Sequence, residues 1–78
     1  MEPIEVTAHF DEFGKITPLH FTWKGSLFRV ESTGRHWSDE AGQHMLVMLS
    51  NGQIYELLFK GVEGSWYIAR SGSGRTVT

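Results

Sequence analysis

The chain has 78 residues, no cysteine and a formal net charge of −2, and 40% of its residues are hydrophobic. The lack of cysteine excludes disulfides and thiolate metal sites, so a single packed core has to stabilise one small domain. The slight negative charge argues against a dedicated nucleic-acid-binding protein, whose affinity normally depends on clustered Lys and Arg side chains. No apolar run is long enough to span a membrane, and residues 1–4 lack a signal-peptide pattern, so we expect a cytoplasmic protein without membrane contact.

Apolar and polar residues alternate with a period of two along most of the chain, which indicates β-strands. The first predicted strand covers residues 4–10, and the turn-forming and charged residues 11–15 connect it to the second. Pro18 has no N–H to donate, so it should lie at the start or edge of that second strand.

The next pattern predicts a hairpin whose two-residue loop is Lys24-Gly25. In that register Phe21 faces Phe28 and Trp23 faces Ser26, and every apolar residue falls on one face. Leu19 is predicted to share this face, opposite Val30, while His20 meets Arg29 on the other face.

Residues 33–43 break the alternation and are predicted to form a loop of about ten residues, a length that is often functional. This segment contains the sequence Arg35-His36-Trp37. A loop tryptophan between two cationic or titratable groups is suited to stack on a base, an acidic peptide or an aromatic ligand. The alternative is that Trp37 folds back as a lid over one end of the barrel.

Asn51-Gly52 lies between two apolar runs and is the strongest hairpin signal in the chain. A strict two-residue loop and a bulged three-residue turn both remain open, and they give different registers. Glu56 is costly to bury unpaired, so its neighbours Tyr55, Leu57 and Phe59 should point inward in either case. Only the bulged turn exposes a common apolar patch, the candidate for self-association, which comprises Leu46, Met48, Ile54 and Leu58.

A last strand is predicted over residues 65–70, after a turn at residues 61–64. Residues 71–78 have the composition of a linker, so the all-β domain is expected to cover residues 1–70 and a flexible tail residues 71–78. Trp23, Tyr55 and Trp66 are assigned to the core. About six short strands with glycine turns predict a small antiparallel barrel or strongly curled sheet, with SH3-like closure.

No residue pattern indicates catalysis, a cofactor or a metal. The four histidines, His9, His20, His36 and His44, do not share the spacing of metal ligands and are interpreted as surface or edge residues. No motif surrounds a serine or threonine that would activate it as a nucleophile. We therefore predict no catalytic, cofactor-binding or metal-ligating residue.

The sequence contains the motifs Phe21-x-Trp23-x-Gly25, Val30, Trp37, Gly52-x-x-Tyr55-Glu56-Leu57 and Trp66-x-x-x-Arg70. In these motifs it resembles a family of short, uncharacterised bacterial domains. Similar segments occur at the C-terminus of proteins resembling Y-family (translesion) DNA polymerases of the catalytically degenerate, mutagenesis-accessory kind. The resemblance covers roughly residues 4–70 and implies a DNA-repair setting, with no catalytic residues to carry over.

These observations lead to three functional hypotheses. The first is a non-catalytic module that binds a protein partner or forms a homodimer, in a DNA-repair setting, with Trp37 as one contact. The second is a weak single-strand nucleic-acid-binding domain that uses Lys24, Arg29, Arg35, His36 and Trp37. The third is a small ligand-binding or hydrolytic barrel, which requires a concave pocket with convergent polar groups.

Overall fold

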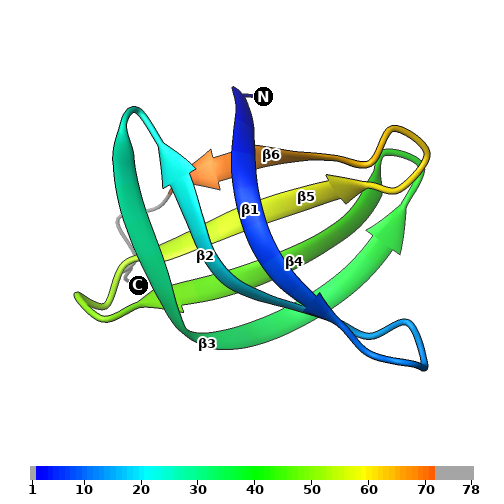
Figure 1. Cartoon of the computed structure of the whole chain (residues 1–78), viewed down its shortest axis with the longest axis horizontal. Coiled ribbons are helices and arrows are strands. Elements are labelled where there is room, and N and C mark those ends of the chain that lie inside the picture. Colours follow the sequence, from blue (N-terminus) through cyan, green and yellow to red (C-terminus); the bar gives the residue numbers. More distant parts are fainter. Residues whose placement is uncertain (1, 72–78) are drawn as a thin grey trace.

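Six antiparallel strands close into a barrel in the computed structural model of the chain, which describes residues 2–71 (Figure 1). Each strand pairs with the next along the chain, and β1 pairs with β6 to close the sheet. The predicted all-β class and six-stranded barrel are confirmed, and the arrangement is consistent with SH3-like closure. The strands are β1 (Glu2–Phe10), β2 (Ile16–Trp23), β3 (Ser26–Asp39), β4 (Gly42–Leu49), β5 (Ile54–Lys60) and β6 (Ser65–Ser71).

The described part of the chain contains no helix capable of crossing a membrane. The tail predicted from residue 71 onward starts one residue too early, because Ser71 belongs to β6 and pairs with Tyr55. Residues 72–78, the rest of that predicted tail, lie outside the described residues.

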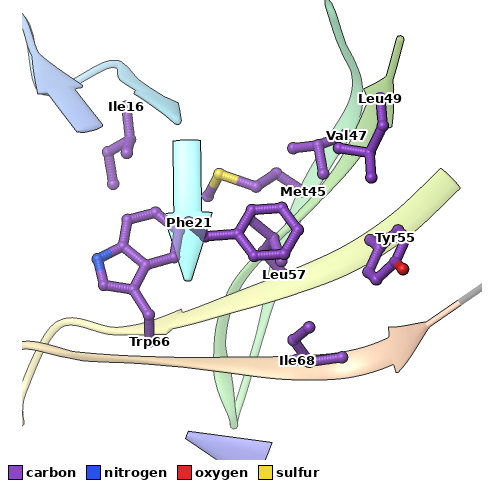
Figure 2. Close-up of a cluster of buried hydrophobic side chains, with 9 residues drawn as sticks. All are labelled: Ile16, Phe21, Met45, Val47, Leu49, Tyr55, Leu57, Trp66 and Ile68. Atoms are coloured by element: carbon purple, nitrogen blue, oxygen red, sulfur yellow. The ribbon is translucent and has the colours of Figure 1, made fainter. Parts of the chain in front are cut away.

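The core fills the inside of the barrel with side chains from alternate positions of the strands. Figure 2 shows how side chains from β2, β4, β5 and β6 converge around the ring of Phe21, which is fully buried. Tyr55 and Trp66 are buried as predicted, and Trp23 is partly buried, with its ring against Tyr55. Fully burying each such large apolar side chain stabilises the fold by about 1.5–3 kcal/mol. The buried cluster comprises Ile16, Phe21, Met45, Val47, Leu49, Tyr55, Leu57, Trp66 and Ile68.

The β2–β3 hairpin has the predicted register, with Phe21 opposite Phe28 and Trp23 opposite Ser26. Lys24 and Gly25 both have positive φ, at 53° and 78°, as a tight two-residue hairpin turn requires. The predicted inward position of Leu19 is wrong, because this side chain is 46% exposed. A bulge in the β1–β2 ladder passes over Leu19 and reverses the alternation, so Ile16 and Pro18 point inward instead.

The predicted loop over residues 33–43 is wrong, since residues 33–39 continue β3 and residues 42–43 begin β4. Two bulges interrupt the β3–β4 ladder, one between Val30 and Ser32 and the other between Thr33 and His36. Each bulge shifts the phase of the alternation, so a period of two does not continue through all 14 residues of the strand. The strand could therefore not be recognised from its sequence pattern. The bulges also bend β3, whose first part pairs with β2 and whose second part pairs with β4.

The Asn51-Gly52 hairpin adopts the bulged three-residue turn. The N–H of Gly52 donates to the carbonyl of Leu49 over 2.9 Å, and Gly52 has a φ of 89°. Val47 therefore pairs with Tyr55 and Met48 with Ile54. Tyr55 and Leu57 point inward as predicted, so the second, outer face of the β4–β5 hairpin carries the alternate side chains.

Candidate functional site

The structure places the Arg35-His36-Trp37 sequence on the second part of β3. His36 pairs with the core residue Met45, so it faces the inside of the barrel, where its Nε2 lies 3.1 Å from the side-chain oxygen of Gln43. Trp37 pairs with His44 on the opposite, outer face. Trp37 is therefore not a lid over the end of the barrel, and His36 does not share a surface with it.

The ring of Trp37 is stacked in parallel on the imidazole of His44. The two ring centroids are 5.0 Å apart with an angle of 4° between the planes. The guanidinium of Arg35 lies over the same indole, 5.0 Å from its centroid. An imidazole and a guanidinium thus contact one electron-rich ring, and the cation–π contact of Arg35 is worth about 0.5–1 kcal/mol at an exposed site.

His44 is buried and has a carboxylate at each ring nitrogen. Its Nε2 lies 2.8 Å from Oδ1 of Asp39, and its Nδ1 lies 2.7 Å from Oε2 of Glu56. A neutral imidazole has one N–H and one lone pair, and the lone pair would then face a carboxylate oxygen. The geometry therefore favours the imidazolium, which donates to both acids. The prediction that His44 is a surface or edge histidine is wrong.

The pKa values of this cluster shift in the directions that the geometry requires. Burial opposes the charge on the imidazole, but the hydrogen bonds to Asp39 and Glu56 together outweigh it and raise the pKa of His44. The hydrogen bond from His44 holds the pKa of Asp39 below its usual value, helped by the N–H groups of Ala41 and Gly42. When His44 is protonated, its imidazolium lies between the carboxylates of Asp39 and Glu56.

The cluster is arranged for structure and recognition. Because both nitrogens of His44 are bound to carboxylates, neither has a free lone pair with which to take a proton from a substrate or ligate a metal. Within residues 2–71, no group of three or more His, Cys, Asp or Glu side chains is placed to hold a metal ion. Arg70 adds a second cation near Glu56, with its Nε 3.8 Å from Oε1 of the carboxylate.

Next to this cluster, the outer face of β4 and β5 is apolar. Met48 and Ile54 are paired across the hairpin and are 39% and 38% exposed, and Leu46 is half-buried. These three residues line a shallow groove of about 170 Å³ against the backbone of residues 32–34 in β3. Three of the four residues predicted to form the apolar patch therefore do share one accessible face.

Leu58, the fourth residue of the predicted patch, is not accessible. It lies on the outer face but is fully buried, with His44 opposite it on β4 and Tyr67 opposite it on β6. A Cβ on Gly42 would come within 3.2 Å of its Cδ1 atom, which shows how closely the β4 backbone covers it. Leu58 is the apolar floor of the His44 cluster, and the prediction that it is exposed is wrong.

Arg29 and Lys24 lie apart from Trp37. Arg29 pairs with His20 on the β2–β3 hairpin. Lys24 is at the tip of that hairpin, with its Nζ 4.7 Å from the ring centroid of Trp23. Of the five predicted binding residues, the structure brings only Arg35 and Trp37 together on one surface.

Asp39, His44 and Glu56 were not predicted as site residues. Their sequence neighbours give no signal, because His44 and Glu56 are ordinary polar residues in apolar strand segments and Asp39 lies in the segment predicted to be a loop. The contact between His44 and Glu56 could have been predicted from the bulged β4–β5 register, which puts His44 opposite Leu58 and Leu46 opposite Glu56. His44 and Glu56 are then diagonal neighbours on the outer face, within reach of each other.

Comparison with models of protein families, with curated proteins and with solved structures found no match to this chain.

Proposed function

We propose that the chain is a non-catalytic interaction module that binds protein through the outer face of β3, β4 and β5. The occupant we propose for this face is a second copy of the chain. The observation that carries the proposal is the outer face shared by Trp37, Leu46, Met48 and Ile54 on neighbouring strands, of which the last three line one groove. An exposed apolar surface next to charged groups is typical of a protein-binding site.

The charges beside the apolar strip favour self-association. Leu46 lies opposite Glu56 on β5 and opposite the bulge of Gly34 and Arg35 on β3. A cation and a carboxylate therefore flank Leu46 at the same level, one on each side. If two copies meet with a two-fold axis along β4, Arg35 of each copy lies against Glu56 of the other. This makes the face complementary to itself in charge as well as in polarity.

The state of His44 supports a binding role over a catalytic one, since its two nitrogens are already engaged by Asp39 and Glu56. The separation of Arg29 and Lys24 from Arg35 and Trp37 weakens the case for nucleic-acid binding, which needs clustered cations along a strand. We propose a DNA-repair setting for the module from the family resemblance alone.

Sedimentation equilibrium of the wild type and of Met48→Asp tests the proposal over about 10 µM to about 1 mM, a range suited to weak interfaces. We expect the wild type to dimerise and the variant to remain monomeric, because an unpaired carboxylate is costly to bury in an apolar contact.

Leu27→Asp is the matched control, since Leu27 is 54% exposed on the β2–β3 hairpin, away from the proposed face. It should dimerise like the wild type, and circular dichroism should show that both variants are folded. A wild type that stays monomeric throughout the range, or a loss of dimer equal in both variants, would contradict the proposal.

A further inference from the structure

The barrel is split between β2 and β3. The ladder between these strands runs from the hairpin turn to the pair His20–Arg29 and ends there. Continued by four residues along each strand, the same register would bring Ile16 opposite Thr33. Instead, these residues line a groove of about 280 Å³ that opens into the barrel.

The sequence explains why the ladder ends at this point. Pro18 has no N–H for a partner on β3, and Leu19 is the bulged residue of β2. On the other strand, the first β3 bulge lies between Val30 and Ser32, immediately after the last pair. From there β3 bends toward β4 and leaves β2.

The split exposes the edge of β3. Residues 30–39 pair with β4 on one side only, and no backbone hydrogen bond within residues 2–71 joins their other side to another segment. In an antiparallel strand, about half of the N–H and C=O groups point to each neighbour, so the free edge is a template for one more strand.

The side chains in the split form an apolar floor with a polar rim. Ile16, Pro18 and Met45 make the floor and are buried. Lys15, Thr33 and His36 make the rim and are exposed. Thr33 and His36 occupy inward-facing positions of β3, opposite Val47 and Met45, where a closed barrel would carry apolar side chains.

We infer that this groove binds an extended peptide segment of a partner protein by strand addition to the free edge of β3. The peptide backbone pairs with residues 30–36, and an apolar side chain enters over Ile16, Pro18 and Met45. An acidic side chain of the same peptide lies next to Lys15. This groove and the groove of the proposed dimer face both include Thr33 and Gly34 of β3, but their other lining residues differ. Variants at Lys15 and at Met48 therefore test the two proposals independently.

Two features of the rim favour an acidic peptide. Lys15 provides a cation, and the nearby carboxylate of Asp11, which accepts the backbone N–H groups of Phe13 and Lys15, offsets only part of that charge. His36 directs Nε2 to the Gln43 oxygen, while its Nδ1 has no hydrogen-bond partner among residues 2–71. On β3, the exposed side chain of Glu31 at the first bulge is negatively charged. An acidic residue at the end of the peptide next to Glu31 is therefore unfavourable.

Nuclear magnetic resonance of the ¹⁵N-labelled full chain tests the inference with a capped hexapeptide of alternating aspartate and valine. A peptide with lysine in place of aspartate is the charge control. We expect the acidic peptide to shift the amide signals of residues 15–18 and 30–36 and to slow hydrogen exchange along β3. The lysine peptide should give neither effect.

Two N-methylated forms of the acidic peptide separate strand addition from binding by side chains. One form is methylated on the aspartate nitrogens and the other on the valine nitrogens. Only one set of N–H groups faces β3, so one form should lose binding at least tenfold and the other should keep it. If both forms bind like the parent peptide, or if the shifts map to β4 and β5, strand addition is overturned.

Protein variants provide the complementary control. Lys15→Glu should weaken binding of the acidic peptide by about two- to fivefold, the range for an exposed charge pair. Lys24→Glu carries the same charge change at the tip of the β2–β3 hairpin and should leave binding unchanged, as should Met48→Asp on the dimer face. Equal weakening by Lys15→Glu and Lys24→Glu, or no binding by the wild type at millimolar peptide, would overturn the inference.

Discussion

His44 shows how much of this site depends on one residue. Its imidazole joins three strands, since it stacks on Trp37 of β3 and is hydrogen-bonded to Asp39 at the end of β3 and to Glu56 of β5. Removing either carboxylate would leave a buried polar group with a missing partner. The cluster therefore holds the β3–β4 end of the proposed dimer face in one conformation.

The direction of the pKa shifts predicts how stability depends on pH. His44 has a raised pKa when folded, so the native state binds the extra proton and its contribution is complete below about pH 6.5. That contribution is lost as the pH rises through the raised value. Asp39 has a lowered pKa, so its contribution is present above about pH 3.8 and is lost as the pH falls. We expect the urea midpoint, followed by tryptophan fluorescence, to be highest between these two values.

The variant His44→Gln tests the alkaline side of this profile. It cannot bind the proton, so its midpoint should change much less than that of the wild type as the pH rises above about 6.5. His9→Gln, at an exposed position of β1, removes a histidine outside the cluster and should keep the wild-type slope. A wild-type midpoint that stays constant across this range would show that the two carboxylates do not hold a proton on His44.

Among the elements, the hairpins followed from the sequence and the long strand did not. Lys24-Gly25 and Asn51-Gly52 act locally, because a positive φ at the turn fixes the register of the few residues around it. The choice between the two registers at Asn51-Gly52 needed the structure, because both place Leu57 in the core.

The full length of β3 could not be predicted for a different reason. Its inward-facing Thr33 and His36 are polar because the barrel is open there, and its bulges change the period twice. Neither property is visible without knowing that β2 and β3 separate. The burial of Leu58 could not be predicted for the same reason, because the residues that cover it belong to the neighbouring strands β4 and β6.

Gly42, the first residue of β4, and Gly52, in the turn after β4, allow a matched prediction. Gly42 has a φ of 145°, and a Cβ there would lie 2.5 Å from the carbonyl oxygen of Phe59. Gly52 has a φ of 89°, but a Cβ there would meet nothing within 4 Å. Gly52→Ala should therefore cost only the left-handed conformation, about 1–2 kcal/mol. Gly42→Ala should cost more, because the backbone of β5 has to move as well.

Urea unfolding of both glycine variants at the same pH measures the difference in their free energies of unfolding. Circular dichroism before the transition shows whether each variant retains the barrel. Equal losses in the two variants would mean that β4 and β5 separate at Gly42 without cost, against the close approach seen in the structure.

At the scale of the whole molecule, the closure of the barrel is its weakest seam. Within residues 2–71, three residue pairs join β1 to β6, from Glu2–Ile68 to Ile4–Trp66, whereas six pairs join β4 to β5. The middle residue of the short seam is Pro3, which has no N–H to donate. We expect these three pairs to open while the rest of the sheet stays folded.

This difference predicts two classes of amide in native-state hydrogen exchange. Amides at the β1–β6 seam, such as that of Ile4, should exchange through local opening, with a rate that depends little on added urea. Protected amides in β4 and β5 should exchange only through global unfolding, with the full urea dependence, because their strands carry Met45, Val47 and Leu57 in the core. If the seam amides showed the same protection and urea dependence as β4 and β5, the barrel would open only as a whole. In that case the three pairs would be as strong as the rest of the sheet.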